Sequence, residues 1–458
     1  MPRVAERTVH YYGVRREVSQ TADLATLLLA RLVYDAPPKT PRAVLDVVRR
    51  LKDGPLDGIS HRRSEESFKQ WLRSYLIINE TTKGTSFHPV HPALTLAGNG
   101  EGVRVEIFID ALARSFSVDE RVALVGTIWA DDRLPPFELM LRDLIRRQLV
   151  DEQVAPSAAD ERFAGADAAA PPLSPVGILT RTKADLHILS QVTVGVQAFI
   201  VHAGRLLAFA LSRYLLARAE VDLDLPIYAA PAADSHESVK ALAHEIIELH
   251  RARLAEQLRV RFMASLTESL AEYGVVGDPP TEQDAQTLAR RVFDPASTLV
   301  RSGAYRAQLD EYGSFAEMAY NYYWSHSGAA SRFLRQLHST HLNLAKKAGY
   351  ANSRSQNSRW HFYWLAPALI ETLLLVSQPR LNADRVLVTA LLRDWHERYG
   401  IAVLIDSAWN DAYRRYFRGM GSPETLNEAN QRRFTEILAE RGRLHKNSDD
   451  FPWVILKD

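Results

Sequence analysis

Apolar residues recur at helical spacing over much of the chain, and this pattern predicts a mainly α-helical protein. Near the N-terminus, four-residue spacing predicts a helix at 65–76, and capping residues predict two earlier helices at 21–34 and 40–51. Residues 75–97 follow as two extended stretches separated by a lysine-glycine turn. Three helices followed by a hairpin is the element order of a winged helix, so we predict a winged-helix-like unit at this end.

A similar order recurs at the C-terminal end. An apolar helix at 367–376 is followed by a helix that we expect Asn382 to cap. A short apolar strand is predicted at 401–405, and a Ser-Pro-Glu start and a glycine stop bound a helix at 422–441. The remaining residues, 443–458, have the pattern of strand, turn and strand. We therefore predict a second winged-helix-like unit here.

Between the two ends the pattern is helix upon helix, with one helix of about 35 residues at 239–273. The segment 151–175 is rich in Ala, Asp and Pro and has few large apolar side chains, so it is predicted to be a linker between separately folded parts. The predicted fold class is a mainly α, multidomain helical bundle with small α+β, winged-helix-like elements at both ends. The predicted domains are 1–150 (winged-helix-like), 151–175 (linker), 176–345 (helical bundle) and 346–458 (winged-helix-like).

Bulk composition narrows the class of protein. The chain has 458 residues, which is longer than one hydrophobic core usually spans, and 46% of them are hydrophobic. It has no cysteine, which excludes disulfides and thiolate metal sites and is typical of a reducing cytoplasm. The most apolar stretch, 193–217, carries two arginines and a histidine, so we expect a buried helix there and no membrane span. The arginine and alanine bias suggests a bacterial source.

Charge is balanced overall, at a formal net of +1, but it is unevenly distributed. No Asp or Glu occurs in the 53 residues between Glu317 and Glu371. The same interval holds ten aromatic residues and six basic ones, namely Arg332, Arg335, Lys346, Lys347, Arg354 and Arg359. A groove that follows a phosphate backbone needs uncompensated cations and must avoid carboxylates. The interval is therefore the predicted nucleic-acid contact.

Within it, the stretch ANSRSQNSRWHFYWLAP (351–367) combines arginines, small polar residues and aromatics. Aromatic rings can stack on unpaired bases, and neutral donors suit phosphate oxygens. The predicted nucleic-acid-binding residues are Lys346, Lys347, Tyr350, Arg354, Asn357, Arg359 and Trp360. The alternative is that the stretch is a solvated loop leading into a buried helix, in which case its aromatic half belongs to the core.

Catalytic motifs are scarce. The chain lacks a phosphate-binding Gly-x4-Gly-Lys loop and a Gly-x-Ser-x-Gly elbow, and HEIIELH (244–250) has Glu248 where a zinc-protease helix needs its second histidine. We predict no metal and no cofactor. Arg332 with His338, and Arg335 with His341, resemble in their spacing the Arg-x4–6-His pairs of HEPN-type ribonucleases. The resemblance implies a histidine acting as acid or base beside an arginine that holds the phosphate.

The sequence thus predicts a non-catalytic, nucleic-acid-binding subunit of a larger bacterial assembly, such as an anti-phage defence or DNA-processing system. Protein partners within that assembly are expected, and DNA and RNA both remain open as ligands. Two alternatives stand beside it. One is the helical ribonuclease just described, and the other is an adaptor that binds protein through its long helix.

Overall fold

The fold is taken from a computed structural model. The structure describes residues 21–33, 47, 50–51, 54, 56, 62–81, 84–87, 90–91, 107–148, 173–219, 227–272, 310–311, 313–315, 317–318, 320–321, 340–353, 360–405, 422–446 and 452–456.

The described residues are mainly α-helical, as the sequence predicts. The helices are α2 (Thr21–Val33), α4 (Arg62–Leu76), α5 (Ile107–Arg114), α6 (Val118–Ile128), α7 (Pro136–Gln148), α9 (Pro175–Val192), α10 (Val196–Arg218), α11 (Glu237–Glu272), α16 (Pro367–Leu381), α17 (Val388–Tyr399) and α19 (Pro423–Glu440). The strands are short: β1 (Ile77–Thr81), β2 (Gly84–Phe87), β3 (Ile227–Tyr228), β4 (Ala351–Ser353), β5 (His361–Tyr363), β6 (Arg385–Leu387), β7 (Ile401–Ala402), β8 (Leu444–Lys446) and β9 (Pro452–Ile455).

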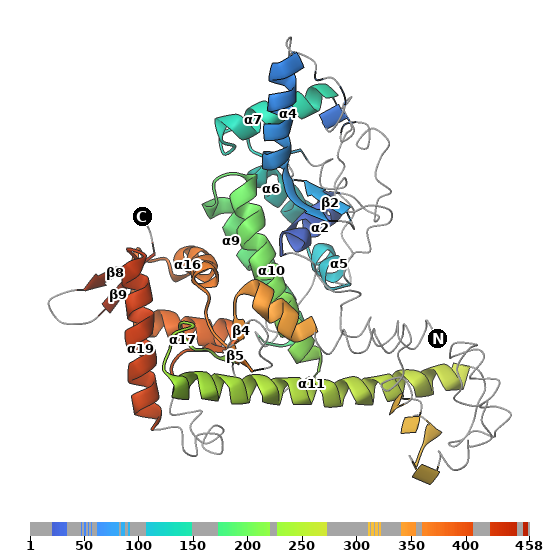
Figure 1. Ribbon diagram of the computed structural model, residues 1–458, viewed down its shortest axis with the longest axis vertical. Coiled ribbons are helices and arrows are strands. Elements are labelled where there is room, and N and C mark those ends of the chain that lie inside the picture. The colour runs from blue at the N-terminus through green and yellow to red at the C-terminus, as the bar shows by residue number, and fades with distance from the viewer. Residues whose placement is uncertain are drawn as a thin grey trace.

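The apolar helix α10 forms the centre of the molecule and packs against α2, α9 and α16 (Figure 1). A side chain at Gly204 would place its Cβ 2.4 Å from the carbonyl oxygen of Thr21, so glycine permits the close crossing of α10 and α2. The helix is long and apolar enough to span a membrane, but 83% of its most apolar window is buried inside the protein. Such burial is typical of a core helix, in agreement with the sequence-based expectation for 193–217.

The hydrophobic core is continuous across the predicted linker. Buried residues of α2, α5 and α6 belong to the same cluster as those of α9, α10, α11, α16, α17 and α19. Leu28 on α2 and Leu207 on α10, for example, are both fully buried in it. The sequence-based boundary at 151–175 therefore does not coincide with a break in the core. The composition of this segment predicts only whether the segment itself is folded, and it carries no information about what the helices on either side pack against. Most of 151–175 lies outside the described residues.

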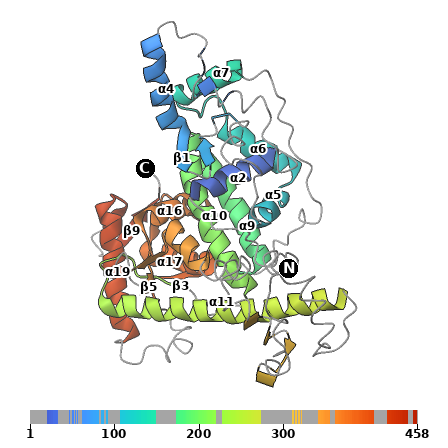
Figure 2. The ribbon, with the colours of Figure 1, turned by 45° about the vertical axis from the view of Figure 1, so that its right-hand side comes forward.

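A smaller core lies at the N-terminal end. Leu72 and Leu76 of α4 pack with Leu141 and Ile145 of α7, and Val47 also belongs to this cluster. The hairpin β1–β2 follows α4 directly and is antiparallel, as predicted. Helix α2 instead packs in the main core, so the three predicted helices do not form one unit with the hairpin. Figures 1 and 2 both show α4 and α7 at one end of the molecule and α11 running along the opposite end.

The C-terminal residues form a second mixed α/β unit. The chain runs α16, β6, α17, β7, α19, β8, β9, and its three-stranded antiparallel sheet has the strand order β6-β9-β8. The prediction for α19 is confirmed: Ser422 caps its start, accepting from the backbone N–H of Thr425, and Gly442 follows its end with φ 67°. The prediction for Asn382 is wrong, because this residue ends α16 in the left-handed conformation, with φ 46°.

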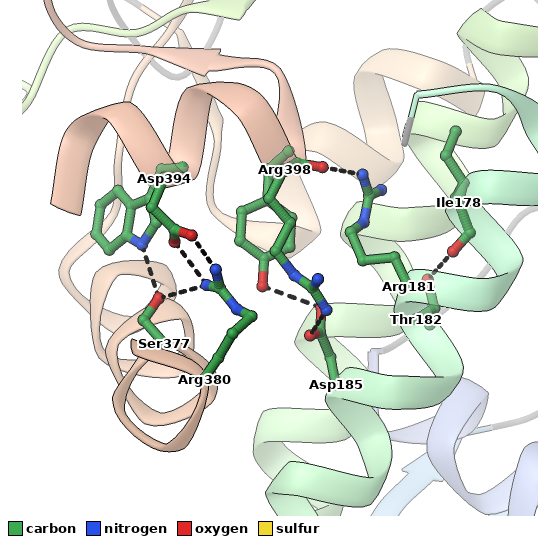
Figure 3. A network of polar contacts seen from close by, with 10 residues as sticks. Ile178, Arg181, Thr182, Asp185, Ser377, Arg380, Asp394 and Arg398 are labelled. Carbon is green, nitrogen blue, oxygen red and sulfur yellow. Dashed lines mark hydrogen bonds and ion pairs between the residues drawn. The ribbon is translucent and has the colours of Figure 1, made fainter. Parts of the chain in front are cut away.

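This unit contacts the rest of the protein in several places. Strand β7 pairs in parallel with β3, so the predicted division at residue 345 also crosses a continuous structure. On its other side, α17 meets α9 through a buried polar network (Figure 3). Arg398 forms an ion pair with Asp185, whose side chain is 0% exposed, and Tyr399 donates to the same carboxylate over 3.0 Å. Arg181, also buried, donates to the backbone carbonyl of Arg398.

Candidate nucleic-acid interface

The stretch that the sequence singles out is built on the hairpin β4–β5. The helical residues 340–348 end at Gly349, whose φ of 89° favours glycine. Strand β4 then pairs with β5, with Asn352 opposite Phe362 and Ser353 opposite His361. Helix α11 packs along β5. The connection between the two strands, which contains Arg354, Asn357 and Arg359, lies outside the described residues.

The inner side of the hairpin belongs to the core. Tyr350, Phe362 and Tyr363 are buried, and the rings of Tyr350 and Tyr363 stack on each other with centroids 5.8 Å apart. Phe209 of α10 meets Tyr350 edge-on at 5.1 Å. A ring that is 0% exposed presents no face to a base, so the sequence-based assignment of Tyr350 to nucleic-acid binding is corrected: it is a core residue. One of its ring neighbours, Phe209, lies more than a hundred residues earlier in the chain, and the local pattern does not reveal that contact.

Beneath the hairpin runs a buried chain of hydrogen bonds. Tyr350 donates to Ser212 Oγ, which lies 2.8 Å from His341 Nδ1. His341 Nε2 lies 3.0 Å from the hydroxyl of Tyr363, and that hydroxyl lies 2.9 Å from His250 Nδ1. The chain ties α10, α11, residues 340–348 and β5 together, and it satisfies polar groups that are costly to bury unpaired.

His341 is therefore a buried structural residue. Its side chain is 0% exposed, and burial lowers its pKa to about 3, with the nearby His250 and Arg213 acting in the same direction. It is neutral at pH 7 and has no access to a solvent-borne phosphodiester. The burial of His341 thus does not support a ribonuclease site at the Arg335–His341 pair. Arg335 and both residues of the second predicted pair, Arg332 and His338, lie outside the described residues.

The outer side of the hairpin is polar and cationic. Trp360 is half-buried and stacks on His244 of α11, with ring centroids 4.7 Å apart and planes 28° from parallel. His244 Nδ1 lies 2.7 Å from the backbone carbonyl oxygen of His361 and must donate to it, since a carbonyl only accepts. Lys346 is exposed and acts electrostatically on His361, and Arg251 lies two turns after His244 on α11. We call the surface formed by Trp360, His244, His361, Lys346 and Arg251 the Lys346 face.

The charged groups of the Lys346 face act on one another electrostatically. Burial, assisted by Lys346 and Arg251 and opposed by Glu248, lowers the pKa of His361 to about 4. Partial burial, together with Arg251, also lowers the pKa of Lys346. The Oε1 of Glu248 accepts from Arg251 over 2.7 Å. At neutral pH His361 is therefore neutral, with Lys346 and Arg251 near it and Glu248 paired to Arg251.

Sequence reasoning found part of this face. Of the residues predicted from the sequence, Lys346 is exposed, and Lys347 and Trp360 are half-buried. Sequence reasoning missed Arg251 and His244, which lie about a hundred residues earlier; His244 drew notice only as part of HEIIELH, and Arg251, the residue after that motif, not at all. Their spacing of seven places them on one helix face, but no local signal says that β5 packs there. Within the described part of the chain no group of three or more His, Asp and Glu residues could hold a metal ion. The two histidines of HEIIELH have separate partners: His244 bonds to the carbonyl of His361, and His250 to the hydroxyl of Tyr363.

No protein-family model, no curated protein and no solved structure matches this chain.

Proposed function

We propose that this protein is a non-catalytic nucleic-acid-binding subunit and that it contacts its ligand through the Lys346 face. The observation that carries the proposal is that Lys346 and Arg251 both act electrostatically on His361, the neighbour of Trp360, which stacks on His244 where the hairpin connection joins β5. The strand connection in that hairpin, 354–359, adds two arginines and no acid in sequence. Cations attract phosphates and an ordered aromatic ring adds a stacking surface, a combination used by proteins that follow a nucleic-acid backbone.

The C-terminal unit is proposed to be a winged helix. Apart from the short strand β7, its element order of helix, strand, helix, helix and hairpin, with the first strand pairing to the last, supports this assignment. In such folds the helix before the hairpin commonly reads the DNA major groove. Here that helix is α19, whose exposed positions include Glu424, Glu428, Glu436 and Glu440 against one exposed arginine, Arg432. These carboxylates would repel phosphates, so we assign the unit to docking on protein and not to reading DNA.

The setting remains as expected from the sequence. We propose a bacterial, cytoplasmic protein that works inside a larger assembly, such as an anti-phage or DNA-processing system, with protein partners and without a cofactor or a membrane. The absence of cysteine supports a reducing compartment. The acidic stripe of α19 supports contact with a basic protein surface.

The test is a salt titration of binding. Replacing Lys346, Lys347, Arg354 and Arg359 with glutamine removes four charges from the proposed contact. If all four contact phosphates, the slope of log affinity against log salt falls by roughly 3, since each contact contributes about 0.7 on single strands and 0.9 on duplex.

A matched control removes the same charge elsewhere. Arg62, Arg63, Arg146 and Arg147 are all exposed on α4 and α7, at the far end of the molecule. Their replacement by glutamine should leave the slope near that of the parent. Equal loss of slope in both quadruple variants would mean that binding follows total charge and would refute the assignment to the Lys346 face.

A further inference from the structure

We infer that helix α6 is a docking site for an amphipathic helix of a partner protein, one that carries basic residues beyond both ends of its apolar face. The inference goes beyond the proposed function, because it depends neither on nucleic-acid binding nor on the Lys346 face. Three features of α6 carry it: an exposed apolar surface, a rigid attachment to the core, and acidic residues at both ends.

The outward surface of α6 is apolar. Val118 and Val122 are 40% and 52% exposed, and Val125, which continues the same line along the helix, is partly exposed. We call these three residues the valine stripe. Beyond the first turn the exposed residues of α6 are Val122, Ala123 and Gly126, and none of them is polar. A surface helix normally turns polar side chains outward, and valine and glycine are poor helix formers. Neither solvation nor helix formation accounts for this composition, whereas a covering partner does.

The helix is held rigidly behind the valine stripe. A capping box fixes its first turn: Ser117 Oγ accepts from the backbone N–H of Glu120, whose carboxylate accepts from the backbone N–H of Ser117. On the inner face Leu124 and Ile128 are buried in the main core, and the buried Arg121 donates to a backbone carbonyl at the end of α5. The helix packs on α9 and on α2, beside which it lies in Figure 2. The stripe is thus ordered before a partner binds, so docking costs little conformational entropy on this side.

Carboxylates lie at both ends of the valine stripe. Asp119 is exposed in the first turn of α6, and Asp131 and Asp132 are exposed just beyond its last turn. Basic side chains near the helix have partners within the protein: Lys183 pairs with Glu120, Arg142 pairs with Asp131, and Arg133 donates to backbone carbonyls near the end of α9. A partner helix with lysine or arginine beyond each end of its apolar face complements the acidic ends of α6.

The size and charge of the surface favour a single helix over a second copy of this chain. With 11 residues α6 is about 16 Å long and presents one helix face, well short of the roughly 800 Å² that each partner buries in a standard complex. Two copies meeting through α6 across a two-fold axis would also bring carboxylates together, since Asp119 of each copy would face either Asp119 or Asp132 of the other. An amphipathic helix with apolar residues at i, i+4 and i+7 matches the stripe in length and spacing.

Binding of synthetic peptides to the full-length protein tests the inference. The probe is a fluorescein-labelled peptide of about 18 residues, long enough to extend past both ends of α6, with leucines on one helical face and a pair of lysines at each end. A second peptide has glutamates in place of the lysines, and a third has serines in place of the leucines. In fluorescence anisotropy titrations at low salt, the lysine-ended peptide should bind about fivefold or more tightly than the glutamate-ended one. The serine peptide should not bind.

A substitution in the valine stripe locates the contact. Val122→Lys should weaken binding of the lysine-ended peptide by about tenfold or more, because a valine side chain loses its burial and a like charge is added. Val260→Lys on α11 is the matched control, since Val260 is 54% exposed and lies on another helix. This control should bind the peptide as the parent does.

The acidic ends are tested by a second pair of variants. Asp119→Asn combined with Asp132→Asn should reduce the preference for lysine ends over glutamate ends. Glu424→Gln combined with Glu428→Gln removes two exposed carboxylates from α19 and should leave that preference unchanged. Equal loss in both double variants would mean that the lysines follow acidic charge in general, and it would overturn the inference.

Thermal melts and sedimentation separate a partner from other ways of covering the valine stripe. Lysine is a better helix former than valine, so Val122→Lys should melt no lower than the parent. A large fall in melting temperature would mean that the chain itself covers Val122, and a dimer that Val122→Lys dissociates would mean that a second copy does; either result overturns the inference. So does a lysine-ended peptide that fails to bind, or that binds Val122→Lys as tightly as the parent. None of these outcomes changes the salt titration that tests nucleic-acid binding.

Discussion

Replacement of Asp185 by asparagine should destabilise the protein severely. The carboxylate of Asp185 is 0% exposed and is shared by Arg398 and the hydroxyl of Tyr399, where α9 meets α17 (Figure 3). Burial lowers the pKa of the neighbouring Arg181 only to about 10, so this guanidinium stays charged at pH 7. Asparagine keeps the shape of the side chain but removes the one negative charge that Arg398 and Arg181 face.

The expected loss follows from leaving buried cations without a counter-charge. Removing one partner of a buried ion pair costs about 3–5 kcal/mol. The low end of that range applies here, since the side chain of Arg398 is 22% exposed and can turn toward water, and since asparagine still accepts from Tyr399. A loss of about 3 kcal/mol is a large fraction of the roughly 5–15 kcal/mol that stabilises a typical fold.

The assay is urea unfolding followed by circular dichroism, with Asp234→Asn as the matched control. Asp234 pairs with Arg433 but is 69% exposed, so its replacement should cost no more than about 1 kcal/mol. A double variant, Asp185→Leu with Arg398→Met, should recover part of the stability lost in Asp185→Leu, because no charge is then left unpaired on α17. If Asp185→Asn and Asp234→Asn lower the free energy of unfolding equally, the reasoning from burial is wrong.

Three further predictions concern stability. Folding lowers the pKa of His341 from 6.5 to about 3, so below pH 6.5 the unfolded state binds more protons than the folded state and stability declines as the pH falls. From pH 7 to pH 5 the free energy of unfolding should drop by about 2 kcal/mol. The drop should be smaller in the His341→Gln variant. Gly204→Ala should lower the free energy of unfolding by about 1–3 kcal/mol, because the added Cβ clashes with Thr21. Gly126→Ala should raise it by up to about 1 kcal/mol, because there the Cβ meets nothing within 4 Å. Thermal melts of the two variants test both values. Fragments 1–165 and 166–458 should be insoluble alone and soluble when co-expressed, because one core crosses the cut; two separately soluble fragments would contradict this.

Local signals in the sequence were sufficient for most individual elements. Ser422 and Gly442 mark the two ends of α19, and the Lys83-Gly84 pair in the sequence predicts the reversal of direction between the antiparallel strands β1 and β2. These features depend on a few adjacent residues, for which capping and turn preferences are informative. Asn382 shows the limit, because the same residue type favours a helix start and a left-handed helix end.

The candidate site was only half predictable for a different reason. Tyr350 and Trp360 have similar local surroundings in sequence, yet one is buried against α10 and the other lies half-buried on His244. Which ring turns inward is decided by contacts with residues more than a hundred positions away. The continuity of the core across 151–175 has the same origin, since the partner of α2 is α10. A single sequence carries no direct signal of such long-range pairings.

Photochemical crosslinking tests the central claim most directly. The full-length protein is bound to a single strand that carries 4-thiothymidine at every second position, irradiated, digested and analysed by mass spectrometry. We predict adducts on peptides that contain residues 340–366 and on the part of α11 around His244 and Arg251, and we predict that unlabelled strand competes them away. Adducts confined to α19, to β8–β9 or to α4, or no competed adducts at all, would contradict the assignment of nucleic-acid binding to the Lys346 face.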